Sequence, residues 1–387
     1  MASPHWTLSP DRLGSMVAVL IGIALYAAPF VTYRANRIAA GAARSIFEAL
    51  PPTTAFVLVG AALSVAIVAI FVRRSIVRLA AASLGLVVIA PCVGLSAGFV
   101  TPAGNTFARV SPALGFWLLG LAFSLLVADA LTRLRLGPWA RLGALSIAAA
   151  AMALLLFSGA WDGLSILKEY ATRADSFWSE ARRHVLLAIG SLAAAVAVGL
   201  PLGVLCHRAP RLRAAILQVL NVIQTIPSIA LFGILMVPLG YLAAFPLAAA
   251  LGIHGIGAAP AFVALFLYSL LPVVANTVVG LDHVPATVVD AARGMGLSNR
   301  QRLFDVELPL ALPVILAGIR IVLVQNLGLA TVAALIGGGG FGTFVFQGIG
   351  QTAIDLVLLG AIPTVALSFA AAVILDAAIE LSNGTSQ

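Results

Sequence analysis

The chain has 387 residues, of which 61% are hydrophobic and only 9% are charged. Soluble domains carry about 25% charged residues, so this chain has too little charge to cover the surface of a water-soluble fold. A disordered chain is excluded as well, because disordered segments are poor in apolar residues. The composition therefore points to a protein embedded in a membrane.

Hydrophobic runs of membrane-spanning length recur along the sequence. They cover residues 13–33, 55–72, 79–100, 112–132, 142–161, 184–206, 214–237, 258–281, 310–335 and 355–377. A helix of about 20 apolar residues crosses a bilayer and satisfies its own backbone hydrogen bonds. The sequence predicts an all-α membrane protein, a polytopic bundle of about ten transmembrane helices in the cell (inner or cytoplasmic) membrane.

Basic residues set the expected orientation, because short cytoplasmic loops are enriched in Arg and Lys. With the N-terminus in the cytoplasm, three Arg clusters fall on the inner side: Arg73, Arg74 and Arg78; Arg133, Arg135 and Arg141; and Arg208, Arg211 and Arg213. The net charge of +8 then reflects topology and contact with anionic headgroups of the lipid membrane. We expect no nucleic-acid partner.

A charged segment interrupts the apolar pattern in the middle of the chain. Within it, Leu164, Ile166, Leu167 and Tyr170 alternate with charged residues, as in a short interfacial helix. We expect three parts from this break, which are an N-terminal five-span membrane extension at 1–162, an extracytoplasmic amphipathic junction at 163–182, and a third unit at 183–387.

The segment between the spans ending near residue 281 and starting near 310 has the pattern of two short helices. Pro285 can begin the first helix, and Gly294 and Gly296 can end it. Ser298 followed by Gln301 predicts a capping box for the second helix. Exposed apolar groups on such a helix pair favour docking onto another protein.

This segment resembles the EAA loop of ABC importer permeases. The resemblance is carried by Asp290, Ala291, Ala292, Gly296, Val306, Leu308 and Pro309, and it implies that these residues and Gly294 form the coupling loop. Asp290 stands where the family usually has Glu, and Val306 where it usually has Ile. In that family the loop is cytoplasmic and sits in a groove of the ATP-hydrolysing subunit, so the resemblance implies an ATPase-coupling loop at 285–309.

Flanking segments narrow the resemblance to the glycine betaine/carnitine/choline (osmoprotectant) permeases. They are 223–231, 267–277, 308–320 and 333–342, and the similarity covers about 183–380. It implies a type I permease core in the C-terminal half, an ABC ATPase on the cytoplasmic face, an extracytoplasmic substrate-binding protein and a permease homodimer. It also implies that ATP and Mg are bound by the ATPase and that this chain is not an enzyme.

Polar residues inside the last five spans are candidates for a translocation pathway, since such groups in hydrocarbon need a partner helix or a water-filled path. The candidates are Gln218, Asn221, Gln224, Thr225, Ser228, Asn276, Gln325 and Asn326. Residues 218, 221, 225 and 228 share one face if the span at 214–237 is a continuous helix. Hydrogen bonding between helices is the equally favoured interpretation.

Two other functions are weighed against the importer. An ion-driven secondary transporter of a small polar solute needs intramembrane carboxylates, and the last five spans hold almost no charge. A membrane enzyme needs clustered His, Asp or Glu, and the histidines give no metal-ligand spacing. The glycine run at 337–342 lacks the Lys-Ser/Thr ending of a P-loop, so no catalytic, cofactor or metal site is expected in this chain.

Overall fold

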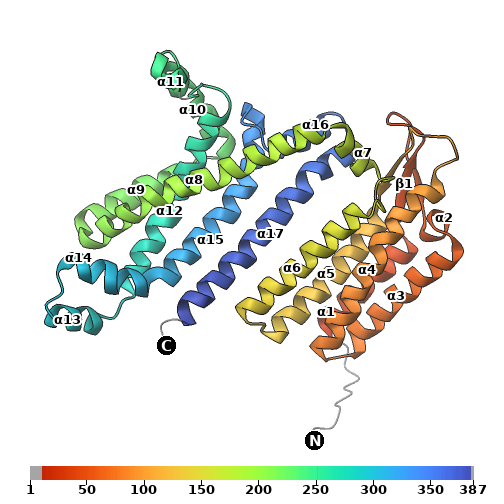
Figure 1. Ribbon diagram of the computed structural model, residues 1–387, viewed down its shortest axis with the longest axis horizontal. Coiled ribbons are helices and arrows are strands. Elements are labelled where there is room, and N and C mark those ends of the chain that lie inside the picture. Colours follow the sequence, from red (N-terminus) through yellow and green to blue (C-terminus); the bar gives the residue numbers. More distant parts are fainter. Residues whose placement is uncertain (1–10, 251, 385–387) are drawn as a thin grey trace, which may run out of the picture. The chain divides into compact units, whose positions relative to one another are not determined.

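The computed structural model describes residues 11–250 and 252–384, and it is almost entirely helical (Figure 1). Among these residues, eight helices are long and apolar enough to cross a membrane, or up to nine if one bent pair counts as a single span. The chain divides after Thr172 into a first and a second unit, each with its own core.

The first unit is built mainly from long apolar helices. Its helices are α1 (Arg12–Tyr26), α2 (Ile46–Ala49), α3 (Pro52–Phe71), α4 (Ser75–Val100), α5 (Leu114–Leu134), α6 (Pro138–Phe157) and α7 (Ser165–Thr172). The 15 residues of α1 rise only about 22 Å, less than the roughly 30 Å of a hydrocarbon core. The first span is therefore shorter than the predicted 13–33, because the chain leaves the helix before Val31.

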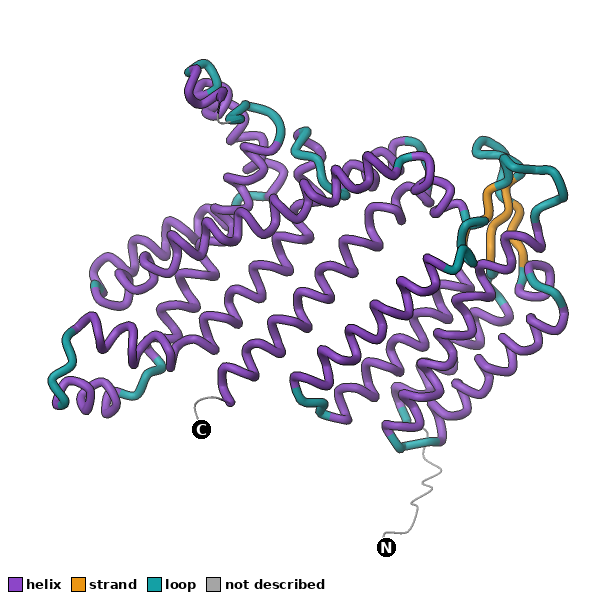
Figure 2. The backbone as a smooth tube through the Cα atoms, viewed as in Figure 1, coloured by secondary structure: helices purple, strands orange, loops and turns teal. Residues whose placement is uncertain are grey.

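A small sheet caps the same unit, and the sequence did not predict it. β1 (Val31–Arg34) lies between β2 (Ala42–Arg44) and β3 (Arg109–Pro112), antiparallel to both (Figure 2). Val31, Thr32 and Tyr33 suit a strand because β-branched and aromatic side chains pack well on a pleated surface.

At the helix ends away from the sheet, Arg78 forms contacts with several segments of the first unit. Its side chain is completely buried and donates to the carbonyls of Val72 (2.6 Å) and Ala69 (3.0 Å). It also pairs with Asp11 at 2.8 Å and Asp129 at 3.1 Å. One cation thus joins the start of α1, the loop between α3 and α4, and the end of α5.

The second unit is also helical but more often interrupted. It contains α8 (Ala174–Arg208), α9 (Pro210–Thr225), α10 (Ser228–Leu242), α11 (Pro246–Ala250), α12 (Ala258–Asp282), α13 (Ala286–Gly294), α14 (Asn299–Gln301), the π-helix η1 (Arg302–Glu307), α15 (Leu308–Val332), the 3-10 turn η2 (Ala333–Ile336), α16 (Gly342–Gly350) and α17 (Ile354–Gly384). A Cβ on Gly199 or Gly203 of α8 would lie within 3 Å of α12 side chains. The Gly199/Gly203 pair therefore serves close helix packing.

The predicted span at 214–237 is not one continuous helix. The helix breaks between α9 and α10, which are bent by 104°. Pro227 follows Ile226, whose ψ of 127° is extended, because a proline disfavours helical backbone in the residue before it. The break places Ser228 on a different helix from Gln218, Asn221 and Thr225, so these four residues do not form one continuous helical face.

Candidate coupling site

The segment between α12 and α15 has the predicted two-part form. α13 ends at Gly294, and the chain turns at Gly296, whose φ of +84° is in the left-handed region. Side chains other than glycine pay about 1–2 kcal/mol in that conformation, which explains a glycine here. Within the described residues, nothing lies within 4 Å of where a Gly296 Cβ would point, so backbone conformation and not crowding selects the residue.

The predicted capping box is confirmed. The Ser298 hydroxyl accepts from the Gln301 backbone N–H at 3.3 Å, and the Gln301 side chain accepts from the Ser298 N–H at 3.0 Å. The next residues form the π-helix η1, in which residues five apart lie over one another. This spacing lets the Arg302 guanidinium donate to Glu307 at 2.7 Å, with both side chains largely buried.

Ionic contacts fix this segment to the ends of α8 and α9. The Asp282 carboxylate lies 2.7 Å from His207 Nδ1 and accepts from Arg213 at 2.8 Å. Arg208 donates to the backbone carbonyl of Asn299 at 3.2 Å. A force on the segment would therefore reach α8, α9 and α12 together.

The predicted coupling residues fall into an inward and an outward set. Ala292 is buried, and Leu308 packs beside an apolar cluster that includes Leu281 and Leu303. The exposed members are Asp290, Ala291, Gly294, Gly296 and Pro309, while Val306 is half-buried. Asp290 pairs with Arg293 at 3.3 Å on the exposed side of α13.

Large apolar side chains of this segment are exposed as well. Met295 is 73% exposed and Phe304 is 57% exposed. Beside Phe304, a shallow hollow of about 270 Å³ is lined by Arg300, Gln301, Phe304 and Asp305. An exposed apolar pair beside charged groups is typical of a surface that docks another protein.

The pathway candidates on α9 and α10 have different surroundings. Gln218, Asn221 and Thr225 are exposed, and Ser228 is half-buried. Gln224 instead donates to the Tyr268 carbonyl at 2.9 Å, and the Tyr268 hydroxyl donates back to the Ile226 carbonyl. Both bonds fasten the break to α12, and the second satisfies the Ile226 carbonyl at the break itself.

The candidates on α12 and α15 are more enclosed. Asn326 is fully buried and donates to the hydroxyls of Ser191 (3.0 Å) and Ser269 (2.9 Å), joining α8, α12 and α15. Asn276 donates to the Pro272 carbonyl within its own helix, and Gln325 is half-buried. The geometry of Asn326 favours the interhelical hydrogen-bonding interpretation.

Sequence reasoning missed several contacts that join distant segments. Arg320 of α15 pairs with Asp376 of α17, although the last spans were read as almost free of charge. Glu180 of α8 accepts from the Gly340 N–H in the glycine run. A lone Arg in one span and a lone Asp in another could have indicated the Arg320–Asp376 pair, but the sequence does not say which helices meet.

The chain matches two family models. Residues 195–383 match the binding-protein-dependent transport system inner membrane component, and residues 11–167 match the N-terminal domain of the ABC transporter permease YehY. The osmoprotectant import permease protein OsmW of Salmonella typhimurium is 43% identical over 180 residues, which are 46% of this chain and 79% of that protein. The chain belongs to the ABC importer permease family.

Other members of the family are similarly close. The osmoprotectant import permease OsmY of Salmonella typhimurium is 41% identical over 54% of this chain and 83% of its own length. The carnitine transport permease OpuCB of Listeria monocytogenes is 36% identical over 48% and 78%. Among solved structures, a chain of the inward-facing MetNI methionine ABC transporter aligns with 21% identity and a TM-score of 0.46, over 52% of this chain and 93% of that chain.

Family membership and the apolar helices together define a multi-pass inner membrane protein with a type I permease core. The family model begins within α8 and ends within α17, so it lies inside the second unit. The first unit corresponds to a separate N-terminal domain that is shared with the YehY permease. The segment between α12 and α15 therefore occupies the part of the chain that carries the importer family.

Proposed function

We propose that this chain is the membrane-spanning permease subunit of an ABC importer that moves a quaternary-ammonium compatible solute, such as glycine betaine, choline or carnitine, into the cytoplasm. The proposal is supported by relatives that are named as osmoprotectant and carnitine permeases. Two copies of the chain assemble with ABC ATPase subunits inside and receive solute from a substrate-binding protein outside. ATP and Mg bind to the ATPase, and this chain hydrolyses nothing.

The geometry between α12 and α15 carries the proposal. It presents Met295 and Phe304 outward while Asp282 ties the base of the segment to α8 and α9. When the ATPase dimer closes on ATP, a subunit docked on this surface pulls the segment with it. The movement passes through the buried contacts of Ala292 and Leu303 into the ends of α12 and α15.

The break between α9 and α10 gives the spans a place to bend. The Tyr268 hydroxyl donates to the Ile226 carbonyl and Gln224 donates to α12, so α9 and α10 can turn about Ile226 and Pro227 while that carbonyl stays hydrogen-bonded. The exposed polar side chains on α9, which are Gln218, Asn221 and Thr225, together with Ser228 and Gln325, are the proposed lining of the solute path. In the same proposal Asn276 borders the path, whereas Gln224 and Asn326 position helices.

Replacing Gly296 with valine tests the coupling role. Gly296→Val forces a β-branched residue into the left-handed region at a cost of about 1–2 kcal/mol or more, so the turn relaxes and the two short helices change direction. We expect ATP-dependent uptake of labelled glycine betaine, in proteoliposomes containing permease, ATPase and binding protein, to fall by at least about tenfold.

Gly296→Asn is the matched control, because asparagine adopts the left-handed region far more readily than valine and no described atom lies within 4 Å of the added Cβ. That variant should retain much more uptake than Gly296→Val. Co-purification with the ATPase distinguishes lost assembly from lost coupling. Full uptake and full assembly by Gly296→Val would show that this turn does not couple the subunits.

A further inference from the structure

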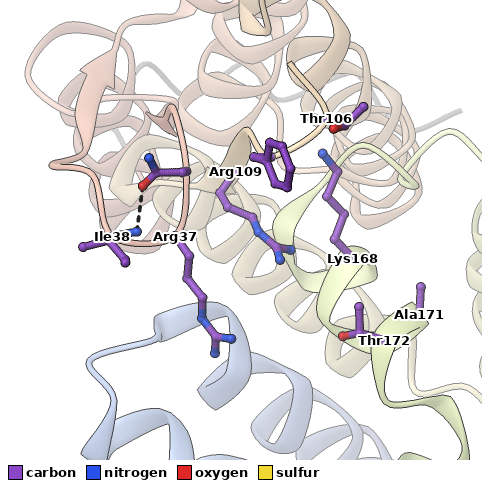
Figure 3. Close-up of a pocket in the computed structure, with 9 residues that line it drawn as sticks. Arg37, Ile38, Thr106, Arg109, Lys168, Ala171 and Thr172 are labelled. Atoms are coloured by element: carbon purple, nitrogen blue, oxygen red, sulfur yellow. Dashed lines mark hydrogen bonds between the residues drawn. The ribbon is translucent and has the colours of Figure 1, made fainter. Parts of the chain in front are cut away.

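A pocket in the cap of the first unit is independent of the coupling site. It has a volume of about 530 Å³ and is lined by Asn36, Arg37, Ile38, Thr106, Phe107, Arg109, Lys168, Ala171 and Thr172 (Figure 3). These residues come from the loop after β1, the loop before β3, β3 itself and α7, all within the first unit. Nothing in the transport proposal uses this pocket.

Three cationic side chains converge on the pocket from three different segments. Arg37 and Arg109 both lie near the Glu169 carboxylate, at 3.8 and 3.6 Å. Lys168 carries the third charge, so the two arginines and the lysine outnumber this carboxylate and leave an excess of positive charge. Bringing like charges together costs free energy, which an anion held between them would recover.

Two of these cations have hydrogen-bonding capacity left. Lys168 Nζ donates to the Ala108 carbonyl at 2.9 Å, and an ammonium group has three donors. The Nη1 atom of Arg109 is buried, yet it has no hydrogen-bond partner among the described residues. A buried cationic N–H group without an acceptor is costly, which indicates that something else supplies the acceptor.

The pKa of Lys168 reflects its burial and the positive charge gathered at the pocket. Burial, and then the nearby charge of Arg109, lower the pKa of the Lys168 ammonium. A bound anion would act in the opposite direction and keep the ammonium charged. The pocket therefore has the electrostatics of a site that is completed by a negative ligand.

The rim of the pocket is apolar and projects outward. Ile38 is 96% exposed and Phe107 is 77% exposed, both near the tips of their loops. The loops are fastened to one another, because Asn105 donates to the Ala35 carbonyl at 3.1 Å. The pocket is larger than one inorganic anion, so a charged group with an attached organic part fits it.

We propose that this pocket binds a phosphate group through Arg109, Lys168 and Arg37. A guanidinium binds phosphate oxygens in pairs, and an ammonium adds a point charge, so this donor set suits a phosphate. The phosphate belongs either to the headgroup of an anionic lipid, with Ile38 and Phe107 against its organic part, or to a soluble phosphate.

The test uses the full chain in nanodiscs of phosphatidylcholine with and without phosphatidylglycerol. Native mass spectrometry counts the phosphatidylglycerol retained after release, and a titration with inorganic phosphate measures binding of the free anion. Each charge-assisted hydrogen bond contributes about 1.5–3 kcal/mol, so Arg109→Gln and Lys168→Gln should each weaken binding by about tenfold to a hundredfold. Uptake assays stay separate, because the pocket and the transport proposal can fail independently.

Arg34→Gln is the matched control, since Arg34 lies on β1 of the same cap but does not line the pocket. Retention of phosphatidylglycerol that depends on Lys168 and Arg109 supports a lipid headgroup, and binding of inorganic phosphate with the same dependence supports a soluble ligand. If Arg109→Gln fails to fold, Lys168→Gln alone decides. Binding of neither probe by the wild type, or equal losses in Arg34→Gln, would overturn the proposal.

Discussion

In the first unit the buried polar centre is ionic, with Arg78 enclosed between Asp11 and Asp129. In the second unit the polar centre where α8, α12 and α15 meet is neutral, with the Asn326 amide shared between Ser191 and Ser269. The largely buried Arg302–Glu307 pair of that unit lies outside this centre, in the segment between α12 and α15. A buried ion pair is expensive to separate, because each charge loses its compensation, whereas a neutral network can exchange partners at lower cost. The first unit is therefore built to keep one arrangement, and the second can change its helix packing.

The helices of the two units also differ, since those of the first unit are more continuous than those of the second. From α3 to α6 the spans of the first unit are unbroken helices, although Pro91 lies inside α4. The second unit contains the α9–α10 break, the π-helix η1 and the left-handed glycines Gly337, Gly339 and Gly340. Each interruption is a place where a packed helix can bend, which an alternating transporter needs.

Removing the cation of the ionic centre should produce the largest effect. Arg78→Met leaves Asp11 and Asp129 near each other, with the partly exposed Arg133 and Arg73 beside them in the described part of the chain. Breaking one side of a buried pair costs about 3–5 kcal/mol. We expect a clear fall in the thermal unfolding temperature of the detergent-purified chain, with early proteolysis confined to residues of the first unit.

Arg74→Met is the control, because Arg74 is exposed at the end of the loop before α4, one helical turn from Arg78. This variant should unfold as the wild type does. If Arg78→Met and Arg74→Met unfold alike, the ionic centre does not hold the first unit together. If proteolysis instead begins in the second unit, the division between a fixed and an adjustable unit is wrong.

Removing the amide of the neutral centre should lower stability less than removing Arg78. Asn326→Leu removes the hydrogen bonds from the amide to Ser191 and Ser269. Both hydroxyls keep hydrogen bonds of 2.6 Å to carbonyls of their own helices. Polar contacts between membrane helices contribute about 0.6–1.7 kcal/mol, so we expect a small loss of stability. Uptake per folded molecule should stay near the wild-type value, since Asn326 holds helices and does not line the path.

Gln325→Leu is the contrasting variant, because the Gln325 side chain is half-buried and belongs to the proposed lining of the solute path. It should lower uptake without lowering the unfolding temperature. The opposite pattern, in which Asn326→Leu abolishes uptake at unchanged stability, would place Asn326 in the path.

The sequence predicted what depends on local spacing and on apolar runs. Run lengths gave the spans, and Ser298 with Gln301 gave the capping box, because both are set within a few residues. The sheet around β1 and the fastening of the α9–α10 break by Tyr268 were missed. Both depend on partners that are distant in the sequence, 42 positions for Tyr268 and Ile226 and 79 for Thr32 and Ser111, which only the folded chain brings together.

One candidate site could be predicted from local sequence and the other could not. The coupling residues could be proposed from the pattern around Gly296, since a left-handed turn favours glycine wherever it occurs. The pocket around Arg109 and Lys168 could not, because its three cations are separated by long apolar spans. Helix-face reasoning placed Ser228 beside Gln218 and failed at Pro227, where the helix ends.

Lowering the pH should destabilise the ionic centre around Arg78 and leave the neutral centre around Asn326 unchanged. This is the smallest of the expected effects. Burial tends to raise the pKa of Asp11, but the hydrogen bond and charge of Arg78, with the Gly14 N–H and the charge of Arg133, outweigh it and lower the pKa. A lowered folded-state pKa means that the stabilisation is complete above the unfolded pKa and is lost as pH falls through the folded value. The loss is smaller than for Arg78→Met because Arg78 keeps Asp129 and two carbonyls.

Asp11→Asn isolates this contribution. At neutral pH the variant should unfold at a lower temperature than the wild type, and the gap should close below about pH 4 as the wild-type carboxylate is protonated. The Asn326 network has no titratable group, so Asn326→Leu should differ from the wild type by the same amount at every pH at which both fold. A gap for Asp11→Asn that does not change with pH would mean that Asp11 acts by packing, and the contrast between an ionic and a neutral centre would then rest on Asp129 and Arg78 alone.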